Sequence, residues 1–96
     1  MKHTLLKILT LFFVAYTSAQ NMDVSGIVQD QTGFPIPGAN IIVKNTNKGT
    51  ITDFDGAFIL TGVEKGATIS VSYIGYITKE LVITDNSKLI IQLQED

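Results

Sequence analysis

The sequence contains no cysteine and no arginine, and its only histidine is His3, close to the N-terminus. Nucleophilic catalysis of the Ser/His/Asp or Cys/His kind needs an imidazole beside the nucleophile. Zinc sites of the usual kind need His or Cys ligands. Beyond residue 19 the chain has neither residue type, so these sites and disulfide bonds are excluded there. We therefore predict that the protein is not an enzyme and holds no metal and no cofactor.

Positive charge is also scarce. After residue 19 the chain carries five lysines against nine acidic residues, a net charge of −4. Nucleic-acid binding needs clustered Lys and Arg side chains that neutralise phosphates. The charge balance therefore argues against a nucleic-acid partner.

The first 19 residues have the three parts of a secretory signal peptide. Lys2 and Lys7 make a positive head, 8–15 is an apolar run, and the small residues 17–19 suit a cut before Gln20. The apolar run is shorter than the ~20 residues that a membrane span needs. We predict a signal-peptide helix over 1–19, with an uncleaved N-terminal anchor as the alternative, and an exported chain of residues 20–96 without a membrane span.

The exported part alternates apolar and polar residues in short runs separated by Gly, Pro, Asn and Asp, and no stretch shows a helical period. This pattern predicts an all-β domain, a small seven-stranded antiparallel β-sandwich. The expected strands are 22–30, 39–44, 50–52, 57–60, 68–74, 76–84 and 89–93, with a turn at 61–66. The apolar members of the pattern should form the core: Val24, Val28, Ile41, Val43, Phe58, Leu60, Ile69, Val71, Ile91 and Leu93.

The stretch Gly49–Phe58 is the most informative part of the chain. We interpret it as a β-hairpin whose turn, 53–56, contains Asp53 and Asp55 and places Gly56 at positive φ. The two carboxylates favour backbone hydrogen bonding in the turn over acid/base catalysis. An EF-hand loop is excluded because its first and twelfth positions would be Ile51 and Gly62, although an irregular, weak Ca²⁺ site stays open.

Several apolar residues leave two interpretations open. Tyr73, Tyr76 and Phe54 form either an exposed aromatic patch for a partner or part of the core. Phe34 and Ile36 flank the prolines of a loop, where they form either a docking surface or a lid over the sandwich.

Four blocks of the sequence resemble the carboxypeptidase-regulatory-like domain, and they follow in the family's order. They are 24–30 (VSGIVQD), 36–41 (IPGANI), 49–58 (GTITDFDGAF) and 71–76 (VSYIGY). The resemblance implies a transthyretin-like (prealbumin-like) sandwich without catalytic residues. It assigns structural motif positions to Gly26, Gly38, Gly49, Thr52, Asp53, Gly56, Phe58, Gly75 and Tyr76.

This version of the domain most resembles the N-terminal extension of SusC/RagA-type TonB-dependent outer-membrane receptors, which import nutrients. The resemblance implies a non-catalytic accessory module, in the periplasm or associated with the outer membrane. Its partner would be the receptor barrel or a periplasmic protein, with glycan as a further candidate. The sequence ends at Asp96 without a TonB-interacting segment, plug or barrel, so we expect a fragment of a receptor or a stand-alone relative.

Two other functions differ in how well the sequence supports them. An independent secreted β-sandwich that binds glycan or a surface protein is the alternative. A hydrolase of the transthyretin-related type is disfavoured, since that family relies on His and Arg and residues 20–96 have neither.

Overall fold

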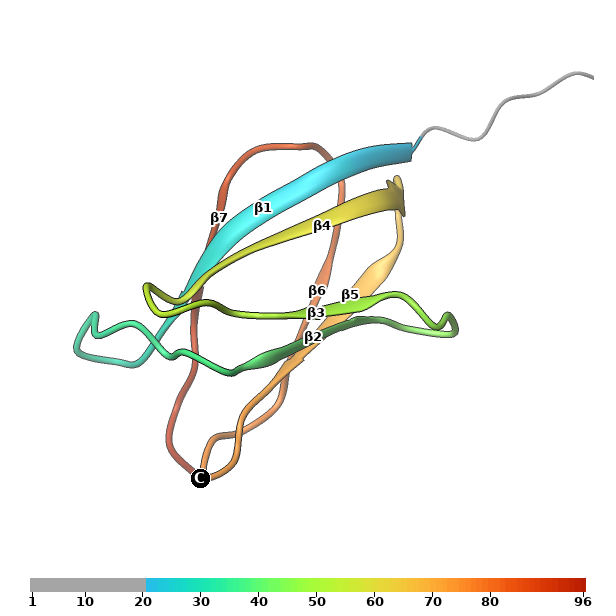
Figure 1. Ribbon diagram of the computed structural model, residues 1–96. Coiled ribbons are helices and arrows are strands. Elements are labelled where there is room, and N and C mark those ends of the chain that lie inside the picture. Colours follow the sequence, from blue (N-terminus) through green and yellow to red (C-terminus); the bar gives the residue numbers. More distant parts are fainter. Residues whose placement is uncertain (1–20) are drawn as a thin grey trace, which may run out of the picture.

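The computed structural model describes residues 21–96 and shows, within them, seven strands and no helix (Figure 1). The strands are β1 (Asn21–Gln29), β2 (Asn40–Val43), β3 (Gly49–Ile51), β4 (Ala57–Glu64), β5 (Thr68–Ser72), β6 (Lys79–Val82) and β7 (Leu89–Gln92). The seven predicted strands are all present, with β5 and β6 shorter and β4 longer than expected. The helix predicted for residues 1–19 lies outside the described residues.

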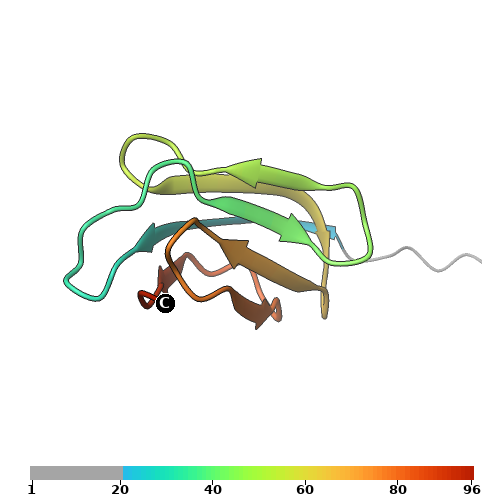
Figure 2. The same ribbon diagram turned by 90° about the horizontal axis from the view of Figure 1, so that it is seen from below.

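The strands form two sheets packed face to face, ordered β4-β1-β7 and β3-β2-β5-β6 (Figure 2). The predicted sandwich is confirmed, but antiparallel pairing throughout was wrong. β1 and β7 pair in parallel, from Gly26 opposite Leu89 to Gln29 opposite Gln92. Parallel neighbours need a long crossover connection. Here the rest of the chain provides it, because the segment after β6 crosses to the other sheet before β7 begins.

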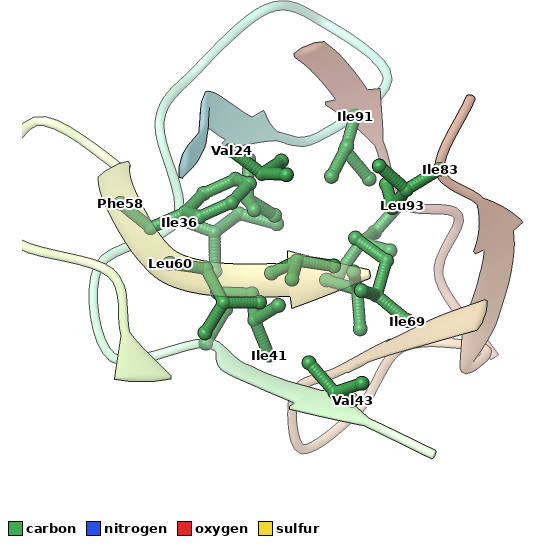
Figure 3. Packing of buried hydrophobic residues seen from close by; sticks show 14 residues of the cluster. Val24, Ile36, Ile41, Val43, Phe58, Leu60, Ile69, Ile83, Ile91 and Leu93 are labelled. Carbon is green, nitrogen blue, oxygen red and sulfur yellow. The ribbon is translucent and has the colours of Figure 1, made fainter. Parts of the chain in front are cut away.

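The core lies between the two sheets, and all ten predicted core residues are buried (Figure 3). Four further apolar residues are buried with them: Ile36, Ala39, Val63 and Ile83. The ring of Phe58 fits against β1 because its partner there, Gly26, has no side chain. A Cβ at Gly26 would lie 2.9 Å from the Phe58 ring and 2.6 Å from the Leu89 carbonyl oxygen. Gly26 is therefore a point of close backbone approach.

The hairpin predicted over Gly49–Phe58 was wrong. β3 pairs with β2 and β4 pairs with β1, so the turn at 53–56 carries the chain from one sheet to the other. The local sequence is that of a tight turn, which is present, but a turn does not decide which strands pair across it. The hairpins of this domain are β2–β3 and β5–β6 instead.

The turn predicted at 61–66 begins later, because β4 continues to Glu64 through a β-bulge. Met22 lies opposite Val63 whereas Val24 lies opposite Leu60, which leaves one extra residue on β4. Gly62 adopts φ +67° in this bulge, a conformation that glycine reaches without steric cost. The bulge turns Val63 back into the core.

Candidate functional site: a loop end built on two aspartate turns

The first of two similar turns starts at Asp30, directly after β1. One carboxylate oxygen of Asp30 accepts hydrogen bonds from the Thr32 hydroxyl (2.7 Å), the Thr32 N–H (2.8 Å) and the Phe34 N–H (3.0 Å). The Asp30 N–H donates to the Phe34 carbonyl and the Gly33 N–H donates to the Asp30 carbonyl. Hydrogen bonding to the carboxylate, chiefly from the Thr32 hydroxyl, lowers the pKa of Asp30 below its usual value of 3.8.

The second turn starts at Asp53 and repeats this pattern. An Asp53 carboxylate oxygen accepts from the N–H groups of Asp55 and Ala57, each at 2.9 Å. The Asp53 N–H donates to the Ala57 carbonyl, and the Gly56 N–H donates to the Asp53 carbonyl. Both turns read Asp-x-x-Gly, with the glycine at positive φ: +91° at Gly33 and +73° at Gly56. The turn interpretation of Asp53 is confirmed.

The two turns are held together at Gly56, which is buried. Its carbonyl accepts a 2.8 Å hydrogen bond from the Val28 N–H, and the Val28 carbonyl accepts one of 2.9 Å from Ile36. A Cβ at Gly56 would lie 2.5 Å from the Val28 carbonyl oxygen and 3.0 Å from the Pro35 side chain. Glycine is therefore required at position 56 by space as well as by φ.

Thr52 is the one buried polar residue of the described chain. Its hydroxyl donates to the Ile36 carbonyl at 2.6 Å and accepts from the Ala39 N–H at 2.8 Å. The Thr52 carbonyl also accepts from the Gly38 N–H at 3.0 Å. Thr52 thus ties residues 31–38, which we call the proline loop, to the start of the second turn. Ile36 in this loop is buried over the core, as the lid interpretation predicted.

The remaining motif positions lie in the strands and in the neighbouring 73–76 loop. Gly49 begins β3, where a Cβ would lie 2.9 Å from the Ile41 carbonyl oxygen. Gly75 accepts a backbone hydrogen bond from Asp96, and Tyr76 forms an isolated β-bridge with Glu95. The C-terminal residues are thereby tied to the 73–76 loop.

Tyr73 and Tyr76 are half-buried and pack against the core, with ring centroids 6.0 Å apart. Partial burial first, and then nearby Asp30, Glu95 and Tyr73, raise the pKa of the Tyr76 hydroxyl. The hydroxyl therefore stays protonated at neutral pH. Tyr73 and Tyr76 therefore belong to the edge of the core and do not form an exposed aromatic patch.

Three strongly exposed apolar side chains are carried by these loops. The proline loop, the second turn, the 73–76 loop and the C-terminus all lie at one end of the sandwich (Figure 2). Phe54 is 93% exposed, Ile74 87% and Phe34 70%. We call this the loop end, defined by Phe34, Phe54 and Ile74. Their side chains are available for contact with another molecule.

No group of three or more potential metal-ligating side chains occurs within residues 21–96. Asp53 already uses one carboxylate oxygen for its own turn.

A surface hollow of about 570 Å³ lies at the opposite end, lined by residues such as Lys44, Lys48 and Glu64 and by none of the motif residues. No helix long and apolar enough to cross a bilayer is found in the described part of the chain. The loop end offers exposed apolar side chains for contact, beside the carboxylates of its two aspartate turns.

The sequence analysis did not predict that Asp30 begins a turn equivalent to the one at Asp53. The available signal was the repeated Asp-x-x-Gly, at 30–33 and 53–56. The first copy adjoins the prolines and is divided by the prediction, with Asp30 at the end of the strand 22–30 and residues 31–33 in a loop.

Comparisons with known proteins give a consistent result. Residues 24–96 match the family described as the CarboxypepD_reg-like domain. TonB-dependent receptor SusC from Bacteroides thetaiotaomicron is 44% identical over 91 residues, which is 95% of this chain. TonB-dependent receptor P39 from Formosa agariphila is 39% identical over 93 residues, 93% of this chain. The chain spans only 9% of the length of each of these relatives.

The fold is also similar to a chain in crystal structures of a type II cohesin–X-dockerin complex from Acetivibrio cellulolyticus. One interface mutant of that complex superposes with a TM-score of 0.63 at 24% identity, over 77% of this chain and 58% of that chain. A second mutant gives 0.61 at 25% identity, over 75% and 56%. These similarities support the β-sandwich architecture.

Proposed function

The chain belongs to the CarboxypepD_reg-like domain family, and from that premise we propose that it is a non-catalytic, protein-contacting module of a TonB-dependent nutrient-uptake receptor. Residues 1–19 would direct export as a signal peptide. Residues 20–96 would act as a folded domain on the periplasmic side of the outer membrane, whether within a receptor or as a stand-alone relative.

One observation carries the proposal. Nearly the whole chain recurs at 44% and 39% identity in two receptors, of which it makes up only 9%. A region reused in this way within much larger proteins is typical of an accessory domain. The lack of His, Cys and Arg after residue 19 supports a role without catalysis.

The loop end supplies the contact surface in this proposal. Phe34, Phe54 and Ile74 are exposed in the chain itself, and a partner would remove them from water. Burial of such side chains contributes roughly 25 cal/mol per Å² of apolar area. Motif residues would then build and hold this end, through the turn at Asp53, the Thr52 hydroxyl and the tight space at Gly56, and would not themselves touch the partner.

A chimeric receptor tests the proposal. The host is a bacterium whose growth on one nutrient depends on a TonB-dependent receptor that contains this domain. The receptor's own domain is deleted, or replaced by residues 20–96 of this chain. We expect deletion to slow growth on that nutrient while the receptor remains in the outer membrane, and replacement to restore growth.

Two variants of the replacement domain make the test specific. Phe34→Asp combined with Phe54→Asp should fail to restore growth, whereas Val82→Asp should restore it. Val82 is a matched control because it is also exposed, at 61%, but lies on β6 away from the loop end. Unchanged growth after deletion of the domain would contradict the receptor role. Saturable binding of an oligosaccharide to the purified chain, lost in Phe54→Asp, would favour the independent glycan binder.

A further inference from the structure

The two sheets leave one side of the sandwich open. β3 and β4 are both outermost strands of their sheets and follow one another in the chain. Two surface hollows of about 370 and 330 Å³ run between them and share Thr50 and Ile59 in their linings. On the opposite side the sheet edges are joined, because Ile77 donates a backbone hydrogen bond to Gln94 and Lys79 donates to the Gln92 carbonyl. The open side is therefore a distinct feature of this fold.

Backbone groups of β4 face this open side. On the side of β4 away from β1, the Ala57 carbonyl accepts a hydrogen bond from the Asp53 N–H, and the Ala57 N–H donates one to the Asp53 carboxylate. Backbone N–H and C=O groups alternate between the two sides of a strand. Those of Ile59 and Thr61 consequently point the same way as those of Ala57, toward a side where no strand of the described chain pairs with β4.

The open stretch is closed at both ends. The Asp53 turn covers Ala57, and the Lys48 ammonium donates a hydrogen bond to the Gly62 carbonyl in the bulge. Between these two points the edge of β4 carries no lysine and no proline, two of the usual devices that protect an edge strand, and the bulge begins only at its far end, at Thr61. At a rise of about 3.3 Å per residue, the window over 58–61 suits an extended segment of about four to six residues.

We propose that this window accepts an extended peptide segment of another protein, which adds to the edge of β4 as a further strand. Main-chain hydrogen bonds to Ile59 and Thr61 would hold the segment. The exposed side chains of Ile59 and Ile51, 67% and 61% accessible, flank the window and favour β-branched apolar residues at alternate positions.

The charges at the two ends of the window specify which charges an antiparallel segment should carry. Lys48 lies at the Gly62 end of the window, and Asp53 and Asp55 lie at the Ala57 end. A segment antiparallel to β4 begins beside Lys48 and ends beside the aspartates. It should therefore have an acidic residue at its amino end and a basic residue at its carboxyl end. This inference does not depend on the receptor role.

A titration followed by nuclear magnetic resonance tests the inference. The exported chain, labelled with ¹⁵N, is titrated with the capped peptide Glu-Val-Thr-Val-Thr-Lys. We expect saturable shifts of the Ile59 and Thr61 amides, and slower exchange of both with solvent. A version with alternate backbone nitrogens methylated should not bind, because it cannot complete the ladder. The charge-reversed peptide, with Lys first and Glu last, should bind roughly fivefold more weakly.

Two matched variants locate the site. Ile59→Lys should weaken binding roughly fivefold through loss of the cross-strand apolar contact. Ile90→Lys should bind as the unmodified chain does, since Ile90 is equally exposed on the same sheet but on β7. Shifts confined to other strands, or binding of the methylated peptide, would overturn the proposal. Concentration-dependent broadening of the Ile59 and Thr61 amides without peptide would overturn it too, by assigning the edge to a second copy of the chain.

Discussion

The Val28 N–H donates a 2.8 Å hydrogen bond to the carbonyl of Gly56, and so joins the strand before the first aspartate turn to the second turn. The two residues are far apart in sequence and adjacent in the fold. Gly56 can approach this closely only because it has no side chain, since a Cβ there would meet the Val28 carbonyl oxygen.

The two turn glycines should respond very differently to substitution. Gly33 has φ +91° and open space around it, so Gly33→Ala should cost only the left-handed strain, about 1–2 kcal/mol. Gly56→Ala should add steric overlap of about 1–3 kcal/mol to that strain. Asparagine tolerates positive φ, so Gly33→Asn should be nearly neutral while Gly56→Asn remains costly. Urea unfolding measures all four, and equal losses at the two positions would contradict the packing described for Gly56.

The two phenylalanines of the 49–58 stretch should separate core from surface. Phe58 is buried opposite Gly26, and Phe58→Ala should cost about 3–5 kcal/mol. Phe54 is almost fully exposed, and Phe54→Ala should stay within about 0.5 kcal/mol of the unmodified chain. Thermal unfolding distinguishes them. A Phe58→Ala melting temperature within a degree or two of the unmodified chain would show that this core assignment is wrong.

Removal of the Thr52 hydroxyl should lower the stability of the fold, although valine has nearly the same shape as threonine. Thr52→Val keeps the shape but leaves the Ile36 carbonyl and the Ala39 N–H without a partner, at about 1–3 kcal/mol for each buried group. Thr61→Val, at an exposed position of β4, is the matched control and should be close to neutral. Denaturant midpoints provide the comparison. Neutral behaviour of Thr52→Val would mean that water can replace the hydroxyl.

The Asp30 carboxylate should make folding pH-dependent. Its pKa is lowered in the folded state, so the unfolded chain binds its proton more readily. The stabilisation from Asp30 is therefore complete above pH values near 3.8 and is lost as the pH falls through the lower folded pKa. Hydrogen bonds from Ser87 lower the pKa of Asp85 as well, so Asp85 changes the stability with pH in the same direction. Asp30→Asn should flatten the fall in stability between about pH 5 and pH 2 without abolishing it, which chemical denaturation at each pH would measure. An unchanged slope would contradict the hydrogen bonds described at Asp30.

The sequence predicted best what depends on alternation along a strand. All ten expected core residues are buried, because each lies on the inner side of a period-2 pattern. Val63 was missed because a bulge at Gly62 shifts the pattern within what looked like a turn. Ile36 was left open because a loop between prolines has no period.

Pairing between strands was harder to predict. The Gly49–Phe58 stretch has the composition of a hairpin, yet β3 and β4 belong to different sheets. Local residues specify the turn, and contacts far along the chain specify the partners of its flanking strands. The parallel pair β1–β7 has the same origin, since β7 takes its place only after the chain has crossed between the sheets.

That parallel pair also determines how the domain responds to a mechanical force. Asn21 at the start of β1 and the C-terminus lie at opposite ends of the sandwich (Figure 2). Because β1 and β7 run side by side in the same direction, tension applied between the two ends slides one strand along the other. The hydrogen bonds from Gly26–Leu89 to Gln29–Gln92 are then loaded together in shear and not unzipped one after another. Loading in shear should therefore let the domain resist a pull along its length before it unfolds.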